Sequence, residues 1–123
     1  MPAKVVDASV LAALIFRESR FSEAASLLAD ASFYEPTLLP YELANITRKK
    51  AIEYPAQTPA FMEAFREFLS HEIEWRAVDS VAVVGLALET RLTTYDASYL
   101  YLSRTLGIPL ITFDERLAKA AQG

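Results

Sequence analysis

The chain has 123 residues, 53% of them apolar and 23% charged, and its 16 acidic and 12 basic side chains give a formal net charge of -4. Three glycines, no cysteine and a single histidine exclude a glycine-rich phosphate loop, a thiolate nucleophile and a zinc ribbon, so that any chemistry must rest mainly on carboxylates. The apolar stretches are far shorter than the roughly 20 residues of a membrane helix, and the N-terminus does not resemble a secretion signal. We therefore expect one globular domain in the cytoplasm.

The first half of the chain is expected to alternate between strands and helices. The pattern predicts, in order, a strand over Ala3 to Val6, helices from Ala8 to Leu14 and from Ser22 to Ala31, a strand and turn over Phe33 to Leu39, and a helix from Tyr41 to Ala51. Ser22 suits the N-cap of its helix, and Pro40 suits the first position of the next one. This order places Asp7 directly after a strand and Glu42 in the first turn of a helix.

The second half continues the alternation. The pattern predicts a helix opening at Thr58 and Pro59, a strand over Glu74 to Ala77, helices from Ser80 to Glu89 and from Asp96 to Leu106, a strand over Leu110 to Phe113, and a helix from Glu115 to Ala121. Ser80 and Asp96 are expected to cap their helices, and the wide apolar coverage of the Ser80 helix predicts deep burial. The phenylalanines between Phe61 and Phe68 recur at helical spacing and are expected to face the core. The alternation predicts a single α/β domain over residues 1–123 with a parallel sheet of four or five strands.

Four acidic residues are expected to converge at one edge of this sheet. Ligands of open parallel sheets bind beyond the carboxyl ends of the strands, and Asp7 and Asp114 each follow a predicted strand. Glu42 and Asp96 lie in the first turn or cap of helices that begin along the same edge, although for each acid alone a capping or turn role is an alternative. Clustered carboxylates repel one another unless a cation or shared protons intervene, and oxygen donors alone suit Mg²⁺ or Mn²⁺. The pattern predicts phosphate-ester chemistry in which a metal activates water and stabilises the leaving oxygen.

The same residues carry a family resemblance. The segments that resemble the four acidic motifs of PIN-domain nucleases, in the family's order and with its usual separations, are Val5 to Leu11, Glu42 to Ile46, Thr94 to Leu100 and Pro109 to Leu117. The resemblance covers essentially the whole chain and is strongest to the small VapC-type toxins of VapBC toxin–antitoxin pairs. It implies a PIN-like three-layer α/β/α sandwich that acts as a metal-dependent endoribonuclease, forms a homodimer and is neutralised by a VapB-like antitoxin.

The resemblance also assigns roles to individual residues. It implies that Asp7 and Asp96 are the principal ligands of Mg²⁺, with Mn²⁺ as an alternative ion, and that Glu42 and Asp114 complete the quartet directly or through water. Thr112, two residues before Asp114 and on the same side of the strand, resembles the family's polar residue beside the site. All four acids are present, so the sequence predicts an active nuclease.

Other features leave alternatives open. Ser9 and Asn45 are candidates for positioning water or a ligand, but helix capping explains them equally well. The basic run from Arg48 to Lys50 is expected to be a solvated helix end, while Arg17, Arg20 and Arg116 are candidates for a basic rim. A PIN-domain RNA-processing nuclease, or a module that binds RNA or a partner without cleaving, remains an alternative function. A two-component receiver domain is disfavoured because no second acid stands beside Asp7, and the last strand is followed by Asp114, Glu115 and Arg116 where a receiver domain would have a lysine.

Overall fold

A four-stranded parallel sheet in the order β3-β2-β1-β4 forms the centre of the computed structural model, which describes residues 1–123. The strands are β1 (Ala3–Val6), β2 (Ser32–Pro36), β3 (Glu74–Arg76) and β4 (Leu110–Ile111). In the register, Ala3 pairs with Ser32 and Val5 with Leu110, so that β1 lies between β2 and β4. The predicted parallel sheet of four or five strands is confirmed, and it has four.

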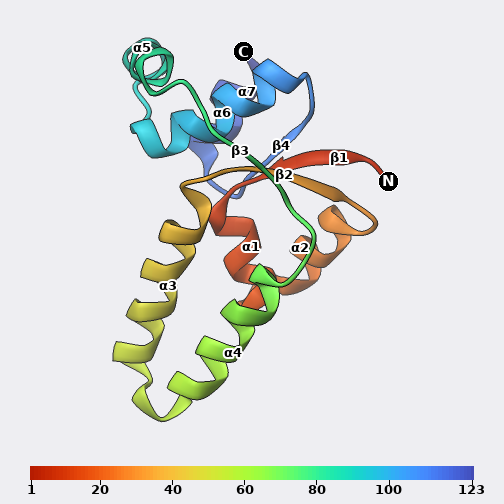
Figure 1. Ribbon diagram of the computed structural model, residues 1–123, viewed down its shortest axis with the longest axis vertical. Helices are drawn as coiled ribbons and strands as arrows, with labels where there is room; N and C mark the ends of the chain where they lie inside the picture. The colour runs from red at the N-terminus through yellow and green to blue at the C-terminus, as the bar shows by residue number, and fades with distance from the viewer.

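Seven α-helices flank this sheet. They are α1 (Ala8–Ile15), α2 (Phe21–Leu28), α3 (Leu39–Glu53), α4 (Thr58–Leu69), α5 (Ser80–Thr90), α6 (Thr94–Leu106) and α7 (Glu115–Gln122). Figure 1 shows α5, α6 and α7 on one side of the sheet and the first four helices on the other, which is the expected α/β/α arrangement. Helices α3 and α4, joined by a 3₁₀ turn (Pro55–Gln57), form a hairpin that extends away from the sheet (Figure 1). None of the helices is long and apolar enough to cross a membrane.

The core lies on both faces of β1. Val5 and Val6 are fully buried, since a strand in the middle of a parallel sheet is covered by helices on both sides. Leu11 of α1 and Leu43 of α3 pack below the sheet, and Tyr99 of α6 packs into the same cluster from the other layer. This packing holds the carboxyl end of β1 in a fixed position, and Asp7 is the next residue.

Three expected helix caps are wrong. Helix α2 begins at Phe21, before Ser22, and its N-cap residue Arg20 makes no side-chain capping bond. Helix α5 is capped by Asp79, whose carboxylate accepts hydrogen bonds from two first-turn amides. In α6 the hydroxyl of Thr93 accepts the backbone N–H of Asp96 over 3.1 Å, so a residue upstream of Asp96 does the capping.

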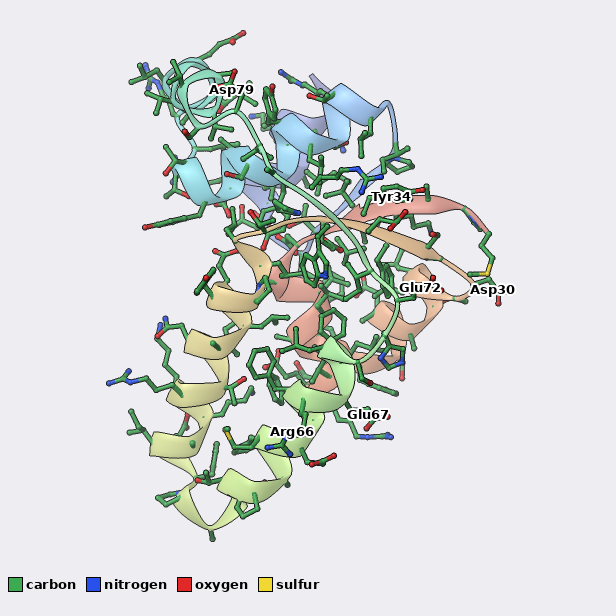
Figure 2. The ribbon with its side chains drawn as sticks, in the orientation of Figure 1. Asp30, Tyr34, Arg66, Glu67, Glu72 and Asp79 are labelled. Carbon is green, nitrogen blue, oxygen red and sulfur yellow. The ribbon has the colours of Figure 1, made fainter.

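The predicted deep burial of α5 is also wrong. Val83 and Ala87 are buried against α6, but Val81 is 81% exposed and Leu88 is 78% exposed. Figure 1 shows α5 at the outside of the molecule, beyond α6, and Asp79 marks its start in Figure 2. Apolar coverage all round a helix normally indicates burial, but here α6 covers only one side of the helix.

The apolar stripe of α4 does face the core, as predicted. Phe68 is 6% exposed, and Phe61 meets Phe16, the C-cap residue of α1, edge to face with ring centroids 5.9 Å apart. The last strand is shorter than predicted, because β4 ends at Ile111. The hydroxyl of Thr112, the next residue, bonds to Asp7 and to the backbone of Asp114, so the chain leaves the sheet at this position.

Candidate active site

Asp7 occupies the carboxyl end of β1 and is almost completely buried, with 4% of its surface exposed. It caps α1, because its Oδ1 accepts the backbone N–H of Val10 over 3.3 Å. Two hydroxyls also donate to this carboxylate: Ser9 to Oδ1 over 2.6 Å and Thr112 to Oδ2 over 2.5 Å. Burial raises the pKa of Asp7 above its ordinary value, and the hydrogen bonds from Ser9 and Thr112 oppose that rise.

Glu42 lies in the first turn of α3, as predicted, because Pro40 occupies one of the first two helical positions. Its Oε1 accepts a 2.5 Å hydrogen bond from the hydroxyl of Tyr99, which reaches across from α6. Burial raises the pKa of Glu42, and the charges of Asp96 and Asp7 raise it further, against the hydrogen bond from Tyr99. Tyr99, a buried residue near Asp96, therefore fixes the orientation of a candidate ligand.

Asp96 and Asp114 complete the group from α6 and from the start of α7. Because Thr93 caps α6, the Asp96 carboxylate is not used as a cap. Burial raises the pKa of Asp96, and the nearby charges of Asp114 and Asp7 raise it further. The charge of Arg116 opposes this rise. Asp114 caps α7 by accepting the N–H of Leu117 over 2.9 Å.

The four predicted acids share one electrostatic environment. The charge of Asp7 raises the pKa of both Glu42 and Asp96, and Asp114 raises that of Asp96. No set of three acidic or histidine side chains stands in a geometry that could hold a metal ion as the side chains lie. The donor set nevertheless fits Mg²⁺ or Mn²⁺, because such ions take oxygen ligands and Mg²⁺ commonly binds only one or two carboxylates, with water completing its shell.

A fifth carboxylate, Glu35 of β2, was missed by the sequence analysis. It is fully buried, its Oε2 accepts the backbone N–H of Val6 over 3.2 Å, and its Oε1 has no hydrogen-bond partner. Burial raises the pKa of Glu35 well above its ordinary value, and the charge of Asp7 adds to the rise. An orphaned buried oxygen beside Asp7 is a second sign that this edge of the sheet is built for a ligand. The sequence signal was an acid inside a strand segment, directly before Pro36.

The structure distinguishes among the residues for which the sequence left alternative roles open. Ser9 belongs to the site, because its hydroxyl donates to Asp7 and accepts the backbone N–H of Phe113 over 3.1 Å. Asn45 is exposed on α3 and lies beside Glu42 and Tyr95 at the edge of a surface hollow. The basic run is only partly the solvated helix end that was expected: Arg48 is exposed, but α3 continues to Glu53 and the half-buried Lys50 pairs with Glu18 over 2.6 Å.

Thr112 is expected to stabilise the site through both of its hydrogen bonds. Its hydroxyl donates to Asp7 and accepts the backbone N–H of Asp114 over 3.0 Å. The isosteric change Thr112→Val removes both bonds, so we expect the free energy of unfolding to fall by about 1–3 kcal/mol in urea titrations. Thr105→Val, at an exposed position of α6, is the control. Equal losses for the two variants would show that the Thr112 bonds contribute nothing specific.

Comparison with known proteins agrees with this geometry. The sequence matches the PIN domain family over residues 4–123, and the chain belongs to that family. It is 32% identical to Ribonuclease VapC3 of Pyrobaculum aerophilum, a match that spans 94% of this chain and 92% of the relative. The fold is similar to the crystal structure of PAE2754 from Pyrobaculum aerophilum, with a TM-score of 0.73 and 26% identity over 99% of this chain and 88% of that one. The expected VapC-type PIN resemblance is confirmed.

Proposed function

We propose that this protein is an endoribonuclease that cleaves RNA phosphodiesters as the toxin of a type II toxin–antitoxin system. The observation that carries the proposal is the placement of four carboxylates: Asp7 directly after β1, Glu42 and Asp96 in the first turns of α3 and α6, and Asp114 at the start of α7. The similarity to a relative named as a VapC ribonuclease supports RNA as the substrate and a toxin role.

We further propose that the reaction depends on Mg²⁺ or Mn²⁺. Asp7 and Asp96 would be the principal ligands, with Glu42 and Asp114 binding directly or through water. A divalent ion in this place supplies an activated water and stabilises the leaving oxygen. The residues of the chain hold the donors in place: Ser9 and Thr112 fix Asp7, and Tyr99 fixes Glu42.

The proposed partners follow from the same family membership. We propose a VapB-like antitoxin that neutralises the protein, a homodimer as the working form, and a cytoplasmic location. The similarity to a VapC-named relative supports the antitoxin. Light scattering on the purified protein measures whether it is a homodimer. The same measurement with an antitoxin encoded by a neighbouring gene shows whether the two proteins form a complex.

The test of the activity uses total cellular RNA. The purified protein is incubated with the RNA in Mg²⁺, in Mn²⁺ and in excess chelator, and new RNA ends are mapped. We expect discrete fragments with either metal and none with chelator, since the quartet by itself carries only repelling negative charge. Cleavage that persists in chelator would contradict the metal proposal, and intact RNA under all three conditions would contradict the nuclease.

A further inference from the structure

A second hollow opens directly beside the carboxylate site. It has a volume of about 340 Å³, which is within the usual range for ligand pockets. Its apolar wall includes Ile46 and Phe113, and its polar wall includes Ser9, Glu18 and Arg20. The hollow therefore combines an apolar surface with groups that can form hydrogen bonds and one cation.

The hollow and the carboxylate site share a wall. The hydroxyl of Ser9, which lines the hollow, donates to Asp7 over 2.6 Å. The same hydroxyl accepts the backbone N–H of Phe113, the residue directly before Asp114. A ligand in the hollow would thus lie next to whatever binds to the carboxylates.

Arg20 is held at this place by two neighbours. The centre of its guanidinium lies 3.7 Å from the centroid of the Phe113 ring, so the aromatic ring covers one face of the cation. Its Nε and Nη2 each donate to the Glu23 carboxylate over 2.9 Å, which leaves Nη1 without a partner. About half of the side chain is exposed, so Arg20 is oriented but can still receive a ligand.

We propose that this hollow is a subsite for one nucleotide of the RNA, adjacent to the phosphodiester that is cleaved. Arg20 binds a backbone phosphate, and the base lies against Ile46 and Phe113 with its edge toward Glu18. The inference rests on the proposed ribonuclease function and names a part of its substrate site.

Charge and shape both favour a nucleotide over a peptide. The cluster of carboxylates repels the phosphates of RNA, so RNA requires a cation nearby, and Arg20 provides one in the hollow, against the ring of Phe113. Guanidinium planes and aromatic rings are the surfaces on which unpaired bases of RNA stack. The Glu18 carboxylate, paired with Lys50 over 2.6 Å, provides acceptors for the N–H groups of a base.

The first test compares two arginines in the same kind of ion pair. Arg20 and Arg66 each pair with a glutamate three residues away, but Figure 2 shows Arg66 on α4, below the sheet and away from the carboxyl ends of the strands. Binding of short fluorescent single-stranded RNA is measured by anisotropy in chelator at several salt concentrations. For Arg20→Ala we expect Kd to rise about three- to tenfold and the salt slope to fall by about 0.7, the value for one lost phosphate contact. Arg66→Ala is expected to change neither quantity.

The second test fills the hollow from an exposed position. Ser19 lines the hollow, whereas Ser26 is exposed on α2 and does not. With the four RNA homopolymers as probes, we expect Ser19→Trp to weaken binding and to reduce the differences between the bases, and Ser26→Trp to leave both unchanged. In cleavage assays Arg20→Ala should raise KM and leave kcat nearly unchanged, as expected for a uniform binding contact.

The outcomes separate this inference from the proposed function. If the wild-type protein cleaves RNA while Arg20→Ala and Ser19→Trp bind and cleave as the wild type does, the subsite is wrong and the nuclease stands. If those variants retain RNA binding but lose binding to the antitoxin, the hollow is a peptide site and the inference is overturned. If the wild-type protein neither binds nor cleaves RNA, the proposed function fails and the subsite fails with it.

Discussion

The change Asp7→Asn is expected to reduce RNA cleavage by about a thousandfold or more and to leave the chain folded. Asp7 is the candidate ligand at the centre of the site, and its charge raises the pKa of two of the other three acids. Loss of a metal-binding charge removes several kcal/mol of transition-state stabilisation, and each 1.4 kcal/mol is about a factor of ten in rate. The measurement is the rate of metal-dependent cleavage of a substrate identified from total RNA.

The fold is expected to survive because asparagine can keep the structural contacts of Asp7. Its Oδ1 can still accept the N–H of Val10 and the hydroxyl of Ser9, and its amide can donate to the hydroxyl of Thr112. The matched control is Asp30→Asn, at an exposed turn residue labelled in Figure 2, because Asp30 has a φ of 59° and asparagine tolerates that conformation. Full cleavage by the Asp7 variant would remove Asp7 from the reaction.

The sequence was sufficient to predict which strand or helix positions Asp7 and Glu42. Asp7 follows an apolar strand, and a proline places Glu42 in the first turn of α3. Parallel strands and the helices that follow them present these positions at one edge, so local patterns were sufficient to place these acids in the fold. The place of Thr112 beside the site was expected from the family resemblance, but not from strand alternation, because β4 ends at Ile111 and neither Thr112 nor Asp114 belongs to the strand.

Features that depend on tertiary contacts, or on a choice between two suitable capping residues, were not predictable. The exposed Val81 and Leu88 of α5 depend on which neighbour covers that helix, and helical periodicity cannot determine this. The capping of α6 by Thr93 was missed because Asp96 is an equally good capping residue by type. The burial of Glu35 was missed because an acid is normally exposed unless it is paired.

Glu35 is expected to make the stability of the metal-free protein depend on pH. Its folded-state pKa lies well above the ordinary value of 4.5, so the stability that it contributes is present below about pH 4.5 and is lost as the pH rises through the raised pKa. Glu35→Gln keeps an acceptor for the N–H of Val6 and cannot ionise. We therefore expect its Tm in chelator to equal that of the wild type near pH 4 and to exceed it increasingly at higher pH.

Two further variants separate ionisation from hydrogen bonding. Glu35→Leu leaves the buried N–H of Val6 without an acceptor, which costs about 1–3 kcal/mol, or several degrees of Tm for a chain of this length. That loss is expected even in acid, where Glu35→Gln should cost nothing. Glu72→Gln, at an exposed glutamate labelled in Figure 2, is the control and should follow the wild-type curve. If the curves of wild type and Glu35→Gln remain parallel from acid to neutral pH, Glu35 does not titrate in this range, and its burial has no bearing on the charge balance around Asp7.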